Sequence, residues 1–159
     1  MTTIAYRGGI LATDRQVTVG NSRKECAKMW AVKGAVIAVA GVLSDGLRFK
    51  DWWLSGKADQ YFAISDNSSI IVVDLKTAQV TEYDSNMVAM PIIGEFEAWG
   101  TGCDFAMGAM AAGSDAVKAV DIGMRYDVYS GIGISVLNIN EIKKVRNYVN
   151  WDTWERRER

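Results

Sequence analysis

Glycines divide the first forty residues into short runs of the kind that form antiparallel hairpins. The runs TTIAYR and ILATD are separated only by Gly8 and Gly9. Glycine tolerates the positive φ that a type I′ turn requires, so this spacing predicts a hairpin of residues 2–7 and 10–14. Residues 16–20 alternate polar and apolar side chains, which indicates a half-buried strand. A second hairpin is predicted where KMWAV and AVIAVAG flank Lys33 and Gly34, because Val and Ile favour strands.

Helical and strand patterns alternate in the rest of the chain. In residues 43–56 apolar side chains recur at helical spacing, with Ser44 or Asp45 as the candidate cap and Gly56 as the stop. Further helices are expected at 58–64, 103–113 and 114–128, the last of them with a Ser114-Asp115 cap, and strands at 68–75, 79–84, 87–93 and 131–139. Pro91 indicates that its strand lies at a sheet edge. The order predicts one α+β domain over residues 1–159, a four-layer αββα sandwich with a charged, exposed tail at 150–159.

Composition excludes several classes of chemistry. The formal net charge is −1, so bulk electrostatics give no reason to expect nucleic acid or a membrane as partner. The chain has no histidine, which rules out Ser-His-Asp and Cys-His catalysts and His-ligated zinc. The two cysteines, Cys26 and Cys103, are far apart in sequence, and no signal peptide is recognised, so we expect a reduced, cytoplasmic protein without metal or other cofactor. A catalytic base must then be Lys, Asp, Glu, Tyr or an α-amino group.

Thr2 is a candidate nucleophile that needs no histidine. Methionine before a small residue is ordinarily removed, and the mature chain would then begin at Thr2. A free α-amine has a pKa of about 7.7–8.0, close to the pH at which a general base is most effective. An N-terminal threonine therefore carries a nucleophile and a base in one residue. The alternative is a small residue at an ordinary terminus.

The opening TTIAYRGGILATDRQVTVGN resembles that of proteasome β-subunits and of the HslV-type peptidases. Thr2, Asp14 and Thr18 fall on positions of the family pattern, and Lys28, in AKMW, matches the family lysine two residues earlier than usual. VAGVLSD resembles the loop into the first helix of the family, with Gly41 and Asp45 on matching positions. The resemblance implies an N-terminal-nucleophile hydrolase fold and threonine endopeptidase activity.

Two downstream motifs extend the resemblance over most of the chain. GTGCDFAMGAM resembles a helix entry of the family, with Thr101 in place of the usual serine, and RYDVYSG places Asp127 and Ser130 on family positions. The resemblance implies that these three residues orient the α-amine and its water.

The same resemblance implies roles for the upstream residues. Lys28 would lower the pKa values of the Thr2 hydroxyl and amine, and Asp14 would hold Lys28. The Gly41 amide would bind the oxyanion of the tetrahedral intermediate. Without the resemblance, a surface ion pair is the favoured interpretation of Lys28 and Asp14.

Substrate and partner expectations also follow from the resemblance. The pocket positions of the family match apolar residues here, which predicts cleavage after hydrophobic residues; they are Val17, Trp30, Val39 and Leu43. The segment between the first helix and SSIIVV is short, so the helical layer on that face is reduced. We expect a homo-oligomeric ring that acts on peptides or unfolded proteins, with an ATP-dependent unfoldase as a candidate partner. Two alternatives remain open: a non-catalytic shell subunit that keeps Met1, and a small-molecule amidase.

Overall fold

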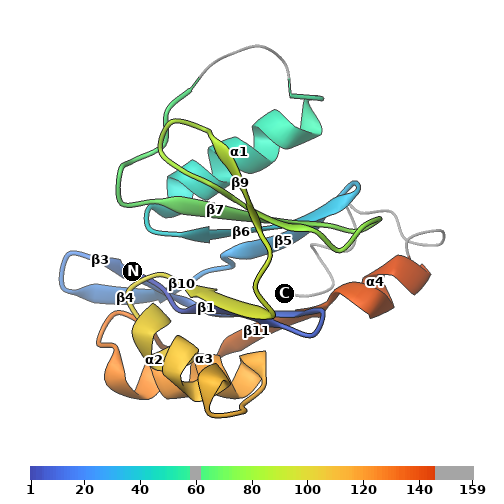
Figure 1. Cartoon of the computed structure of the whole chain (residues 1–159). Helices are drawn as coiled ribbons and strands as arrows, with labels where there is room; N and C mark the ends of the chain where they lie inside the picture. The colour runs from blue at the N-terminus through green and yellow to red at the C-terminus, as the bar shows by residue number, and fades with distance from the viewer. Residues whose placement is uncertain (58–61, 146–159) are drawn as a thin grey trace. The chain divides into compact units, whose positions relative to one another are not determined.

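A computed structural model describes residues 1–57 and 62–145 of the chain. The backbone groups into two compact units. The first unit comprises Met1–Lys28 and Ile93–Asn138, and the second comprises Met29–Ile92 together with the chain from Ile139 onward. Figure 1 shows the elements of both units. Each unit is described by itself below.

The first unit is built on the antiparallel sheet β10-β1-β2-β11. Its strands are β1 (Ile4–Arg7), β2 (Ile10–Asp14), β10 (Phe96–Trp99) and β11 (Ile134–Asn138). The turn between β1 and β2 uses Gly8 at φ +61° and Gly9 at φ +80°, which confirms the predicted hairpin. A separate two-stranded ribbon follows, β3 (Gln16–Val19) with β4 (Ser22–Glu25). Strand β3 was predicted from the sequence, whereas β4 and β10 were not.

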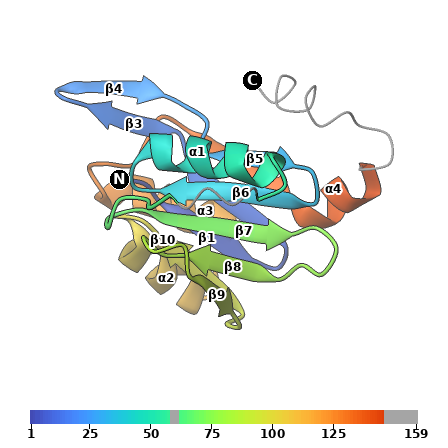
Figure 2. The ribbon, with the colours of Figure 1, turned by 90° about the horizontal axis from the view of Figure 1, so that it is seen from above.

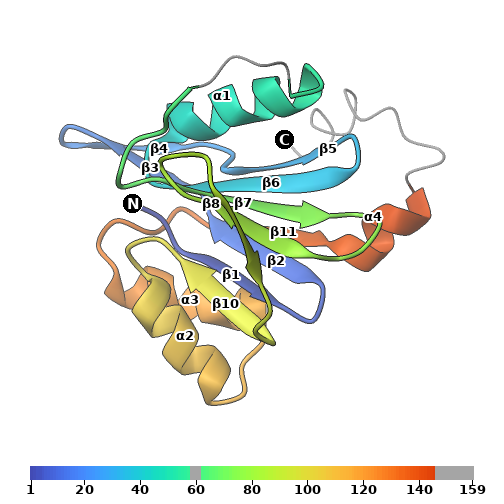
Figure 3. The ribbon, with the colours of Figure 1, turned by 45° about the horizontal axis from the view of Figure 1, so that its top comes forward.

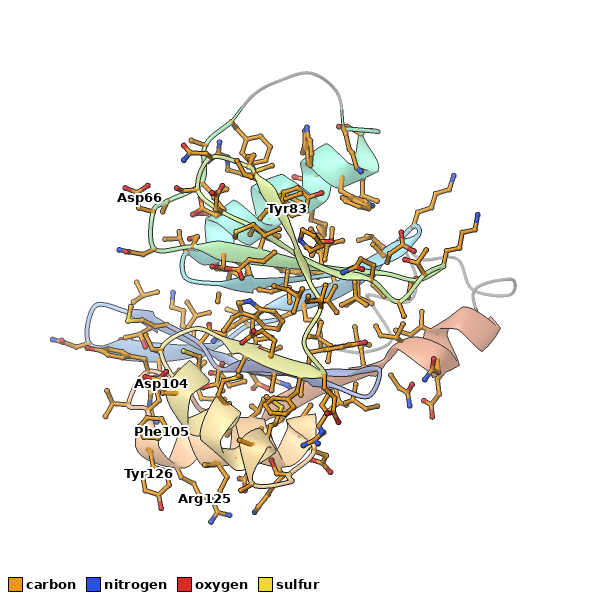
Figure 4. All side chains as sticks on the ribbon, in the orientation of Figure 1. Asp66, Tyr83, Asp104, Phe105, Arg125 and Tyr126 are labelled. Atoms are coloured by element: carbon orange, nitrogen blue, oxygen red, sulfur yellow. The ribbon has the colours of Figure 1, made fainter. Side chains whose placement is uncertain are left out.

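Two helices cover this sheet, α2 (Cys103–Ala111) and α3 (Ala116–Tyr126), which lie side by side in Figure 3. Small and apolar side chains of both helices pack on alanines of the strands, in a core that includes Ala5, Ala12, Ala106, Met110 and Val120. The predicted cap of α3 is confirmed, because the Asp115 carboxylate accepts from the Lys118 amide at 2.7 Å. On the outer side, the labelled rings of Phe105 and Tyr126 contact each other with centroids 5.6 Å apart (Figure 4).

The second unit contains the five-stranded antiparallel sheet β5-β6-β7-β8-β9. Its strands are β5 (Met29–Val32), β6 (Ala35–Ala40), β7 (Ser69–Asp74), β8 (Val80–Tyr83) and β9 (Ala89–Ile92). Helix α1 (Leu43–Leu54) lies across β5 and β6 in Figure 2, and Phe49 is its fully buried anchor. Around Phe49 pack Trp30, Ile37 and Val39 of the sheet. The predicted edge position of Pro91 is confirmed, since β9 is the last strand of the sheet.

Helix ends in this unit differ in part from expectation. Neither Ser44 nor Asp45 caps α1; Val42 occupies the N-cap position and no side chain caps it there. Asp45 instead lies within the first turn, where its charge is favourable to the helix dipole. Gly56, at φ +80°, ends the helix as predicted. Of the helix expected at 58–64, residues 58–61 lie outside the described residues and 62–64 are not helical.

Two further points concern the C-terminal part. Helix α4 (Ile139–Val145), which the sequence analysis did not predict, follows β11 directly. The predicted tail at 150–159 lies outside the described residues. Within the part of the chain that the structure describes, no helix has the length and apolar character needed to cross a membrane.

Candidate active site

Thr2 precedes β1 and is held by backbone contacts from the segment that follows β10. The Gly102 amide donates to the Thr2 carbonyl at 3.2 Å, and Thr2 is 1% exposed. A Cβ added at Gly100 would collide with the Thr2 carbonyl, and one added at Gly102 would collide with the Thr3 side chain. Both glycines of the GTG motif are therefore required because Thr2 and Thr3 lie too close to leave room for a side chain.

Lys28 places its ammonium group directly against the Thr2 hydroxyl. The Lys28 Nζ donates to Thr2 Oγ1 at 2.8 Å, to Asp14 Oδ1 at 2.9 Å and to the Met1 carbonyl at 3.3 Å. These three acceptors match the three protons of a lysine ammonium. The Thr2 hydroxyl in turn donates to the Met1 carbonyl at 2.5 Å. The pair of Lys28 and Asp14 is therefore buried beside Thr2, at 2% and 0% exposure, and is not a surface ion pair.

Asp14 is a four-fold acceptor at the end of β2. Besides Lys28, it accepts from the amides of Thr3 at 3.0 Å, Gln16 at 3.1 Å and Gly131 at 2.9 Å. Charge-assisted bonds of this kind stabilise a buried carboxylate, which in turn provides the counter-charge for the ammonium. Burial lowers the pKa of Lys28 from its ordinary value, and the attraction of Asp14 opposes this effect only in part.

A chain of hydrogen bonds connects the Thr2 nitrogen to a buried carboxylate. Thr2 N donates to Thr101 Oγ1 at 3.2 Å, and Thr101 Oγ1 donates to Asp127 Oδ2 at 2.6 Å. The same Asp127 oxygen accepts from Ser130 Oγ at 2.6 Å. Since the Ser130 proton points to Asp127, Thr3 must donate in its 2.8 Å contact with Ser130. Asp127 thus fixes the direction of every proton in this network.

The loop after α3 brings Asp127 and Ser130 to this position. The Asp127 amide still closes the last turn of α3, on the Gly123 carbonyl, and the Ser130 amide donates back to the Asp127 carbonyl. Gly123 is required here because its added Cβ would lie 2.6 Å from the Thr3 methyl group. The predicted grouping of Thr2, Asp14, Lys28, Thr101, Asp127 and Ser130 is therefore found within one unit.

Two contributors to this cluster were missed by sequence reasoning. Thr3 donates to Ser130 through its hydroxyl and to Asp14 through its amide. Gln16 is 2% exposed, and its side-chain amide donates to the Val128 carbonyl at 3.4 Å and to Thr18 Oγ1 at 3.3 Å. A glutamine directly after an aspartate and arginine gives no sequence signal of burial. The Thr18 hydroxyl, which the family pattern singled out, serves here as an acceptor for Gln16.

The remaining predicted residues are distributed between the units. Val17, on β3, is partly buried in the first unit. In the second unit, Trp30 and Val39 belong to the core under α1, at 7% and 1% exposure, and Leu43 packs at its margin. This packing favours a core contribution for Trp30 and Val39, and the hydrophobic specificity pocket stays a prediction.

Gly41 follows β6 in the second unit and adopts φ +110°. No hydrogen bond of its amide is found among residues 1–57 and 62–145.

Across the same described residues, no group of three or more His, Cys, Asp or Glu side chains is placed to hold a metal ion. In the first unit, the Lys28 ammonium polarises the Thr2 hydroxyl. The Thr101 hydroxyl, held by the Asp127 carboxylate, orients the Thr2 nitrogen.

Comparison of sequences identifies no relative, since no family model and no curated protein matches the chain. Comparison of structures gives solved HslV/proteasome-type peptidases. BPH of Thiobacillus denitrificans in complex with epoxomicin has a TM-score of 0.65 at 17% identity, covering 86% of this chain and 96% of that chain. BPH alone gives 0.64 at 17% identity, covering 86% and 95%. Eukaryotic HslV from Trypanosoma brucei gives 0.60 at 21% identity, covering 86% and 97%.

These likenesses establish the fold class. The chain has the mixed α/β fold of HslV and BPH, with several antiparallel sheets and four helices among the described residues. The fold class predicted from the sequence is confirmed.

Proposed function

We propose that this protein is a threonine peptidase in which Thr2, freed of Met1, is the N-terminal nucleophile. The observation that carries the proposal is the environment of Thr2. Its Oγ1 lies 2.8 Å from the buried ammonium of Lys28, and its nitrogen donates to the Thr101–Asp127 pair. An N-terminal threonine placed in this way has a polarised hydroxyl and an oriented base. The shared fold with HslV and BPH supports the same reading.

Removal of Met1 is required by the chemistry. While Met1 is attached, the Thr2 nitrogen is an amide without basicity, and the Met1 carbonyl accepts from both Thr2 Oγ1 and Lys28 Nζ. Hydrolysis of the Met1–Thr2 bond leaves an α-amine that is already hydrogen-bonded to Thr101. It also frees the hydroxyl and one ammonium proton for a substrate.

The reaction then follows from the positions of these groups. The Thr2 α-amine takes the hydroxyl proton while Oγ1 bonds to the carbonyl carbon of the scissile peptide. The Gly41 amide, for which the described residues supply no acceptor, is the proposed donor to the resulting oxyanion. Collapse breaks the C–N bond, and the leaving amine receives the proton from the α-amine. The ester on Thr2 is hydrolysed by a water that the α-amine deprotonates, which restores the hydroxyl.

Lys28 acts electrostatically throughout. Its charge, held by Asp14, favours the alkoxide character of Thr2 Oγ1 at the moment of attack. Burial lowers the pKa of Lys28, and the negative charge of Asp14 opposes this effect by stabilising the ammonium.

We further propose a cytoplasmic, self-assembling enzyme that acts on peptides or unfolded chains. An ATP-dependent unfoldase is a candidate partner, as the HslV-like fold suggests.

The test combines intact mass with labelling. The purified chain should lack Met1, and a peptide epoxyketone should add once per chain at Thr2, while Thr2→Ala should not be labelled and should not cleave fluorogenic peptides. Assembly of Thr2→Ala, measured by light scattering, should match that of the wild type. A chain that keeps Met1 and resists the label would contradict the proposal and favour a non-catalytic shell subunit. Hydrolysis of small amides but not of peptides would favour an amidase.

A further inference from the structure

A buried hydrogen-bond relay in the second unit supports the backbone at Gly41 and Val42. The Val42 amide donates to Ser68 Oγ at 3.0 Å, and Ser68 Oγ donates to Asp45 Oδ2 at 2.7 Å. The same carboxylate oxygen accepts from the Ser65 amide at 3.0 Å. Asp45 and Ser68 are each 4% exposed. Because a serine hydroxyl has one proton, the bond to Asp45 leaves the Ser68 oxygen as the acceptor for Val42.

The turn that carries Ser68 also packs directly on Gly41. Residues 65–68 form a turn closed by the Ser68 amide on the Ser65 carbonyl at 2.9 Å. A Cβ added at Gly41 would lie 2.5 Å from the Asn67 carbonyl oxygen and 2.7 Å from Ser68 Cα. Gly41 adopts a φ of +110°, which only glycine can adopt at low energetic cost. The relay holds the Gly41–Val42 peptide, and the packing of Asn67 and Ser68 on Gly41 restricts the φ that connects this peptide to the preceding one, which carries the Gly41 amide.

The charge of Asp45 maintains the relay. Burial alone would raise the pKa of the Asp45 carboxyl, but the hydrogen bonds from Ser65 and Ser68, together with the charge of Arg48 at 3.8 Å, outweigh burial and the pKa lies below its ordinary value. Asp45 is thus an anion at neutral pH. It accepts from both donors and holds the Ser68 proton, which leaves the Ser68 oxygen free to accept from the Val42 amide.

We propose that Ser68 is a positioning residue for the oxyanion donor, orienting the Gly41 amide through Val42 and Asp45. This inference rests on the proposed function, in which the Gly41 amide binds the oxyanion. The functional consequence is that the loop enters the reaction already rigid, so no reorganisation is needed when negative charge develops on the substrate oxygen. Ser68 itself would not contact the substrate.

The test uses variants of the full chain with Met1 removed. Ser68→Ala deletes the relay, and Ser68→Thr retains the hydroxyl. Asp66→Asn is the matched control, since Asp66 lies exposed in the same turn (labelled in Figure 4). Because loss of a whole oxyanion donor costs about 100- to 1,000-fold in kcat, we expect Ser68→Ala to lower kcat by about 10- to 100-fold with KM within about two-fold. Ser68→Thr should recover most of this loss, and Asp66→Asn should match the wild type.

A second readout does not depend on catalysis. Amide hydrogen exchange at Val42 should accelerate by about 10-fold or more in Ser68→Ala, because the amide loses its acceptor. Unchanged Val42 exchange, or wild-type kcat in Ser68→Ala, would overturn the inference. Absence of Thr2-dependent turnover in the wild type would instead refute the proposed function and the positioning role with it, whereas accelerated Val42 exchange would still identify the relay itself.

Discussion

Replacing Lys28 by methionine tests how the buried charges near Thr2 are balanced. The side chain keeps its length and apolar stem, but the Asp14 carboxylate loses its counter-charge at 2.9 Å. Removing one partner of a buried ion pair typically costs about 3–5 kcal/mol. Asp14 retains the amides of Thr3, Gln16 and Gly131 as donors, so we place the loss at the lower end, about 3 kcal/mol.

The reciprocal change, Asp14→Ala, should be worse. It leaves the Lys28 ammonium and three backbone amides without their common acceptor. Each orphaned buried amide adds at least about 1 kcal/mol to the cost of the unpaired charge, about 6 kcal/mol in total. This loss is comparable with the whole stability of many domains, about 5–15 kcal/mol. We therefore expect Asp14→Ala to be largely unfolded where Lys28→Met is still folded.

The assay is urea denaturation followed by tryptophan fluorescence, with all variants at one protein concentration because assembly contributes to apparent stability. Lys33→Met provides the control, since Lys33 is exposed and its replacement should change the free energy of unfolding by less than about 0.5 kcal/mol. The reasoning would be refuted if Lys28→Met were as destabilising as Asp14→Ala, or if Lys28→Met were no more destabilising than Lys33→Met. Both site variants should be inactive toward peptides.

Two further predictions concern single groups. Thr101→Val removes the hydroxyl between Thr2 N and Asp127 and should lower kcat by about 100-fold, in the range of general acid–base effects. Thr101→Ser keeps the hydroxyl and should retain most activity in a fluorogenic peptide assay. Equal activity of the two variants would contradict this role of Thr101. Because the pKa of Asp45 is depressed, its contribution to stability is present above its ordinary value near 3.8 and is lost as pH falls through the lower folded value. Asp45→Asn should accordingly be less stable than the wild type at pH 7, and urea titrations should show this difference shrinking toward pH 3, so a constant difference would argue against it.

Much of the fold was predictable because its signals are local. The hairpin at Gly8 and Gly9, the cap at Asp115 and the stop at Gly56 each depend on residues within a few positions of one another. The elements missed have no such signal. Strand β4, SRKE, has four exposed residues and therefore no alternation of polar and apolar side chains, and β10, FEAW, breaks the alternation with two consecutive apolar residues, Ala98 and Trp99.

The candidate site shows the same division between local and distant information. Thr2, Lys28 and Asp127 were predicted through motifs that resemble a known family, and the structure brings them together within one unit. The amides that bind Asp14 were not predicted, because a backbone donor has no residue signature. Ser68 was missed for a related reason: only its pairing with Val42 and Asp45, 26 and 23 positions away, distinguishes it from other serines.

The close approach of Gly100, Gly102 and Gly123 to the N-terminal strand has a consequence for recognising active members of this fold. A side chain at any of these three positions would displace the backbone or side chain of Thr2 or Thr3, and with it the Thr2 hydroxyl that we propose as the nucleophile. Under the proposed function, glycine is therefore required at all three positions for Thr2 to keep its place beside Lys28. In a survey of genomes, a homologue with Thr2 but a larger residue at one of them should be counted among the inactive copies, even where every polar group of the site is present.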